Sequence, residues 1–168
     1  MKKSLLLLLP AILIFTACNS GKKEDPGKFK PEEHANAPAE NVQVLKAYLN
    51  LKDALVSSSP EEASTASSNL VSMIGGFGSN EEFMAIQTSA QAIAEKEDLE
   101  EQRQAFEELS EEVYELCKKE PCGQKIYKQY CPMAFDFKGA AWIAAEKEIR
   151  NPYFGDKMMK CGEVKETL

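Results

Sequence analysis

This sequence is poor in histidine, has no net positive charge and has no long apolar run. Its 168 residues include one histidine, His34, which excludes a site built from several imidazoles and leaves no Ser/His/Asp or Cys/His arrangement. The 27 acidic side chains outnumber the 20 basic ones, for a formal charge of -7, whereas a general nucleic-acid binder needs a basic face. Glycine-rich phosphate loops are also missing, because Gly75 and Gly76 follow a predicted helix. We therefore predict neither an enzyme nor a nucleic-acid binder.

The longest apolar run, from Leu5 to Phe15, is eleven residues and is too short to span a bilayer, which takes about 20. Two lysines precede the run and small residues follow it, an order typical of a secretory signal. The run ends in Phe15-Thr16-Ala17-Cys18, which resembles a bacterial lipobox. We expect residues 1–17 to be a lipoprotein signal peptide, with Cys18 lipidated and the protein held in the cell envelope, facing the periplasm or the cell surface. An ordinary signal peptide cleaved nearby is the alternative.

Residues 18–38 are expected to form a flexible tether between the membrane and the domain. After Cys18 they carry four lysines and four acids among prolines and glycines, with almost no apolar side chains. Such a segment cannot bury enough surface to offset the entropy of ordering it. His34 falls in this tether and is expected to be a solvated linker residue.

Residues 39–168 are expected to form a single domain that is mainly α-helical. Apolar residues recur at three- and four-residue steps, and helix-starting residues stand at Ser59-Pro60, Asn80 and Asp98. Short connections favour antiparallel neighbours, so we predict an antiparallel up-down bundle of about four helices. Met73 and Met84 are assigned to its core. The fourth helix is acidic, with ten acids and three bases over residues 97–120, and we expect an outer face that is solvated or docks a basic partner.

The segment after Pro121 is predicted to be small and irregular, with two candidate short strands. These lie at residues 126–131 and 140–143, and a turn is predicted at Asn151-Pro152-Tyr153-Phe154-Gly155. Cys117 and Cys122 stand at a helix end and in the following loop, where a local disulfide is expected.

Two sulfur triplets mirror each other in this segment. One is Cys131-Pro132-Met133, and the other is Met159-Lys160-Cys161, with Met158 beside it. In an extended chain, residues i and i+2 point to the same side, so each triplet presents a thiol with a thioether. If the triplets meet, these soft ligands select Cu(I) or its chemical relative Ag(I). The alternatives are a Cys131–Cys161 disulfide, which persists outside the cytosol, and two thiols that are buried separately. The metal site and the disulfide both require the two cysteine sulfurs to approach each other.

Several stretches of the C-terminal segment form specific motifs. They are Gln129-Tyr130-Cys131-Pro132-Met133-Ala134, Gly139-Ala140-Ala141-Trp142, residues 148–155 and residues 158–164. With the helical stretch 48–55, they resemble an uncharacterised bacterial domain over about residues 40–168. That domain occurs in secreted proteins and lipoproteins, and attached to periplasmic adaptor subunits of copper/silver efflux pumps.

The resemblance implies that Cys131, Met133, Met159 and Cys161 bind Cu(I) or Ag(I). The expected role is a lipid-anchored protein that buffers the ion or hands it to an efflux system, with the periplasmic adaptor as partner. The alternative is a non-enzymatic envelope lipoprotein that acts as a structural or interaction module and keeps its cysteines in disulfides.

Overall fold

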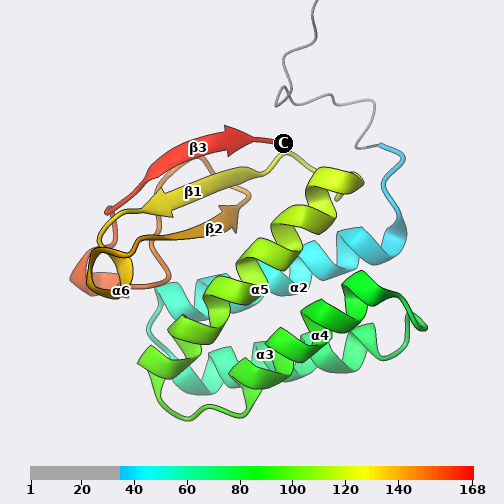
Figure 1. Cartoon of the computed structure of the whole chain (residues 1–168), viewed down its shortest axis with the longest axis horizontal. Helices are drawn as coiled ribbons and strands as arrows, with labels where there is room; N and C mark the ends of the chain where they lie inside the picture. The colour runs from blue at the N-terminus through cyan, green and yellow to red at the C-terminus, as the bar shows by residue number, and fades with distance from the viewer. Residues whose placement is uncertain (1–34) are drawn as a thin grey trace, which may run out of the picture.

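The computed structural model describes residues 35–168, which form a helical bundle covered on one side by a small sheet (Figure 1). The predicted signal peptide, Cys18 and most of the predicted tether lie outside the described residues. Four main helices follow one another in the chain and pack in that order, which confirms the predicted bundle. They are α2 (Ala39–Val56), α3 (Pro60–Ile74), α4 (Glu81–Ala94) and α5 (Leu99–Lys119). Over residues 35–168, no helix is long and apolar enough to cross a membrane.

Local capping explains where three of these helices begin. The side chain of Ser59 accepts a hydrogen bond from the Glu62 amide ahead of α3. The side chain of Asn80 accepts from the Glu82 and Phe83 amides, and that of Asp98 accepts from two amides of α5. Each cap satisfies donors that have no partner inside the helix. These caps confirm the three predicted helix starts. The starts could be predicted because each cap joins residues only two or three positions apart.

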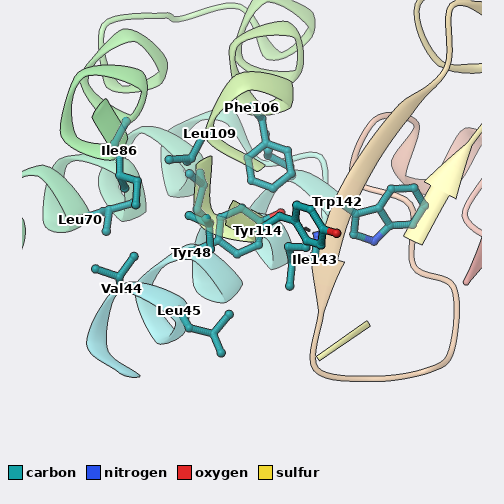
Figure 2. Close-up of a cluster of buried hydrophobic side chains, with 14 of the residues drawn as sticks. Val44, Leu45, Tyr48, Leu70, Ile86, Phe106, Leu109, Tyr114, Trp142 and Ile143 are labelled. Carbon is teal, nitrogen blue, oxygen red and sulfur yellow. Dashed lines mark hydrogen bonds between the residues drawn. The ribbon is translucent and has the colours of Figure 1, made fainter. Parts of the chain in front are cut away.

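The core lies where the helices meet the sheet. Figure 2 shows Tyr48, Phe106 and Ile143, from α2, α5 and strand β2 (Ala140–Ala144), gathered in this region. The Tyr48 and Phe106 rings stack with centroids 5.1 Å apart. The Tyr48 hydroxyl accepts a hydrogen bond from the Ile143 amide at 3.0 Å and lies 2.8 Å from the Ser110 hydroxyl. One buried tyrosine therefore joins two helices to the sheet.

The assignment of Met84 to the core is wrong. Its side chain is 56% exposed on α4, whose buried face is formed by Phe83, Ile86, Ala90 and Ile93. Met84 lies one residue after Phe83, and a helix turns by about 100° per residue, so the two side chains point in different directions. Met73 packs against the core as predicted.

Three antiparallel strands form the sheet, in the order β2-β1-β3. β1 (Tyr127–Cys131) and β2 confirm the two predicted strands, and β2 packs against α5. The third strand, β3 (Glu163–Thr167), was not predicted because its charged sequence lacks a clear apolar face. β3 pairs along the other edge of β1, so its position depends on a partner more than thirty residues away.

Candidate functional site

Two free cysteines meet at the end of the sheet. Cys131 is the last residue of β1 and is fully buried, while Cys161 lies in the loop before β3 and is partly exposed. Their sulfur atoms are 2.7 Å apart although the residues are 30 positions apart in the chain. The approach that both sequence interpretations required is therefore present.

The turn formed by Asn151, Pro152 and Tyr153, the Asn-Pro-Tyr turn, holds the loop that carries Cys161. Asn151 is fully buried, and its side-chain amide donates a hydrogen bond to the Cys161 carbonyl at 2.7 Å. Its main-chain amide donates to the Met159 carbonyl at 2.9 Å, and its side-chain oxygen accepts from the Tyr153 amide at 2.8 Å. The Tyr153 hydroxyl in turn donates to the Ala141 carbonyl of β2. The motif thus connects the second thiol to the sheet that carries the first.

Arg103 of α5 anchors the same turn to the bundle. It is 1% exposed, and its Nε donates to the Pro152 carbonyl at 2.8 Å. Its Nη2 donates to the Leu55 carbonyl and the Ser58 hydroxyl. Gly155 passes beside this group with φ +53, and a Cβ there would lie 2.3 Å from the Ser58 Oγ. The Nη1 of Arg103 donates to the Glu100 carboxylate at 2.8 Å. The sequence pattern gave no signal for the contacts with Leu55, Ser58 and Pro152, because each lies more than forty positions from Arg103 in the chain.

The Cys161 thiol does not have the electrostatics of a reactive cysteine. Burial and the adjacent Cys131 thiol raise the pKa of Cys161 to about 11. Cysteines that act as nucleophiles have lowered pKa values, because nearby positive charges or helix N-termini stabilise the thiolate. At neutral pH the Cys161 sulfur carries its proton, so binding of a metal there must release it.

The geometry of the pair can be tested against a bridging metal. A tetrahedral site with metal–sulfur bonds of about 2.3 Å places two ligand sulfurs about 3.8 Å apart. The observed 2.7 Å means that the sulfurs must separate by about 1 Å to accept an ion between them. Cys161 lies in a loop and is partly exposed, so that movement does not require β1 to shift. In the described part of the chain, no cluster of three or more His, Cys, Asp or Glu could hold a metal.

The methionines do not lie as the mirrored triplets predict. Met133 and Met158 line one surface hollow, while Met159 is not among its lining residues. Met159 instead accepts a hydrogen bond at its main-chain carbonyl from Asn151. The proline between Cys131 and Met133 lies in a turn and not in an extended strand, so the i, i+2 rule does not apply there. The structure thus brings Cys131 and Cys161 together, and places Met133 and Met158 in one hollow beside them.

Two other predicted features lie away from this site. Cys117 and Cys122 form the expected local disulfide, with Cα atoms 5.3 Å apart. The acidic outer face of α5 is also present, where Glu108, Glu111 and Glu115 line an exposed hollow. Docking of a basic partner there stays a prediction.

Comparison with known proteins matches the helical part of the chain. Residues 44–124 match the family described as protein of unknown function (DUF3347). The DUF3347 match covers most of α2, all of α3 to α5 and the Cys117–Cys122 disulfide. It ends before β1, so Cys131, Cys161 and the motifs of residues 129–164 lie outside it, and of the resemblance predicted over residues 40–168 the match covers the helical part alone. Neither a curated protein nor a solved structure gave a significant match.

Proposed function

We propose that this protein is a lipid-anchored, extracytoplasmic binding protein for a soft monovalent metal ion, Cu(I) or Ag(I). Cys131 and Cys161 would bind the ion through their sulfurs, and the protein would buffer it or hand it to an efflux system through a periplasmic adaptor. The observation that carries the proposal is the contact between two free thiols that lie 30 residues apart.

The chemistry of the donor set supports a soft ion. Sulfur ligands favour Cu(I), whereas hard cations need oxygen ligands and zinc usually takes four Cys or His ligands. Two thiols with methionines nearby fit the ligand preference of Cu(I). They do not fit the preferences of hard cations or zinc. The raised pKa of Cys161 argues against that thiol as a nucleophile, because its thiolate is scarce at neutral pH.

The test is a titration of reduced protein with Cu(I) in the presence of a competing chelator. We expect one ion per chain, and loss of that binding in a Cys131→Ser, Cys161→Ser variant. A Cys117→Ser, Cys122→Ser variant is the matched control, because it removes the same number of sulfurs from a different place. Equal affinity in the wild type and the Cys131→Ser, Cys161→Ser variant would refute the proposal.

A second candidate function is an envelope module in which Cys131 and Cys161 form a disulfide. It is favoured by the sulfur separation of 2.7 Å, which is closer to the covalent distance of about 2.05 Å than to the metal-bridged one. Such a disulfide would close a loop of about 30 residues and stabilise the domain by about 3–4 kcal/mol. Its role would be structural or would involve contact with a partner.

Thiol counting separates the two functions. The protein is purified without reductant, and its reactive thiols are counted and mapped by mass spectrometry. Two reactive thiols at Cys131 and Cys161 support metal binding. No reactive thiol at either position, with a crosslink between them, supports the structural module.

A further inference from the structure

Two methionines line a hollow beside the thiol pair. Met133 lies in the turn after β1, and Met158 follows the short 3-10 helix η1 (Gly155–Lys157). The hollow has a volume of about 380 Å³, and the rings of Phe135, Tyr153 and Phe154 also line it. Two thioethers from separate loops therefore share one surface depression.

Both methionines contact the thiol pair through their main chains. The Met133 amide donates a hydrogen bond to the Cys161 sulfur. The Cys161 amide donates to the Met158 carbonyl at 3.0 Å. Both residues line the hollow and contact Cys161 through their main chains, so the hollow and the thiols are neighbours.

An unusual turn holds one side of the hollow. Within the four-residue element α6 (Ala134–Phe137), residues Phe135, Asp136 and Phe137 have φ values of 51°, 55° and 67°. Left-handed backbone costs an L-residue about 1–2 kcal/mol, so three in succession are rare. Such conformations persist where the surrounding structure fixes them, and they cluster at ligand sites.

This turn leaves apolar side chains at the mouth of the hollow. Phe135 packs edge-on against Tyr153, with centroids 5.2 Å apart, whereas Phe137 is 76% exposed and Met133 is 38% exposed. Packing against the core explains why a methionine stands at position 73. It does not explain the methionine at position 133. A thioether kept at the surface next to two thiols is suited to meeting a ligand from solvent.

We propose that Met133 and Met158 form a thioether entry site that captures a soft monovalent cation and passes it to Cys131 and Cys161. This inference rests on the proposed metal-binding function. Thioethers are neutral, soft ligands that need not lose a proton to bind. Asp136, which also lines the hollow, attracts cations to it without competing for a soft ion, whereas the Glu100 carboxylate on the same hollow is paired with Arg103 and Lys157.

Transfer is a ligand exchange without oxidation or reduction. A metal–thioether bond breaks as a metal–thiolate bond forms, and each thiol that becomes a ligand releases its proton to water. The ion keeps its single positive charge throughout.

The experiment titrates Ag(I) into reduced full-length protein whose methionine methyl groups carry ¹³C. We expect the methyl signals of Met133 and Met158 to shift, while those of Met84 and Met159 do not. In a Met133→Leu, Met158→Leu variant, which conserves volume, we expect Ag(I) uptake to slow by about tenfold with one ion still bound. A Met84→Leu, Met159→Leu variant is the matched control and should behave as the wild type.

The outcomes separate this inference from the function on which it rests. Shifts of both methyl groups that persist in the Cys131→Ser, Cys161→Ser variant support the entry site directly. If the wild type binds Ag(I) through its cysteines but the two methyl signals stay still and the Met133→Leu, Met158→Leu variant takes up Ag(I) at the normal rate, the entry site is refuted and the metal-binding function stands. If the wild type binds no Ag(I), the metal-binding function fails and the entry site fails with it.

Discussion

The side-chain amide of Asn151 donates a hydrogen bond to the main-chain carbonyl of Cys161 at 2.7 Å. This contact gives the Asn-Pro-Tyr turn a physical role, because it fixes the loop that brings the second thiol to Cys131. Asn151 is fully buried, so both ends of its amide depend on partners within the protein. The position of the thiol pair is thus set by a residue that would never touch the ion.

Replacing Asn151 by Asp should destabilise the protein and loosen the Cys161 loop. The substitution keeps the shape but puts an oxygen where the Cys161 carbonyl needs a donor, which should cost about 1–3 kcal/mol. Urea unfolding at neutral pH measures the loss. Asn69→Asp, on the exposed face of α3, is the control and should change stability by less than about 0.5 kcal/mol. Equal stability of the two variants would show that the contact with Cys161 does not matter.

Arg103→Met should be among the most destabilising substitutions in the chain. It leaves the Pro152 and Leu55 carbonyls without their donor in a buried position, with an expected loss of about 2–4 kcal/mol. Thermal or urea unfolding checks this. Arg150→Met removes the same charge from a side chain that is 42% exposed, and should have little effect.

Tyr48→Phe isolates the hydroxyl that joins the bundle to the sheet. The ring stacking on Phe106 is retained, but the Ile143 amide loses its acceptor, which should cost about 1–3 kcal/mol. Tyr127→Phe, on the partly exposed β1, makes the same chemical change and should stay within about 0.5 kcal/mol of the wild type. Chemical denaturation compares the two. A Tyr48→Phe variant as stable as Tyr127→Phe would mean that water replaces the hydroxyl.

Removing the Cys117–Cys122 disulfide should affect stability and leave metal affinity unchanged. The bond closes a short loop, for which chain entropy predicts about 2 kcal/mol. Unfolding of the Cys117→Ser, Cys122→Ser variant measures that loss, and chelator competition measures Cu(I) affinity. A fall in affinity while the variant remains folded would place this disulfide in the metal site.

Glu112 should make stability depend on pH. Burial and the neighbouring Glu108 raise the pKa of Glu112 above its usual value, and its Oε2 is buried without a hydrogen-bond partner. Because the unfolded chain gives up this proton more readily, the folded state loses stability as the pH rises through the folded pKa. Glu112→Gln should therefore melt higher than the wild type at pH 7, with the difference vanishing near pH 4. Glu107→Gln, exposed on the same helix, should not show that pattern.

Features set by nearby residues could be predicted from the sequence. Ser59, Asn80 and Asp98 cap helices through amides two or three residues away, and Cys117 reaches Cys122 across five positions. These contacts require closure of only short loops, so residue type and spacing are enough to indicate them.

Contacts between distant residues could not be predicted in the same way. β3 pairs with β1 from more than thirty residues away, and its charged sequence carries no strand pattern. Arg103 and Asn151 donate to the main-chain carbonyls of Pro152 and Cys161, and such bonds leave no trace in the identity of the partner residue. The error at Met84 is of another kind, because a turn of about 100° per residue already places Met84 off the stripe formed by Phe83, Ile86, Ala90 and Ile93.

Four helices, an acidic face, a local disulfide and two cysteines that had to meet to act together can be derived from residue types and spacing alone. The contact between Cys131 and Cys161, and the hollow that Met133 shares with Met158 and not with Met159, became clear from the folded structure. The reason is how far apart along the chain the interacting residues lie. Helices, caps and local crosslinks follow from neighbours along the chain, whereas the site forms only when buried Asn151 and Arg103 hold separate loops against the sheet and the bundle.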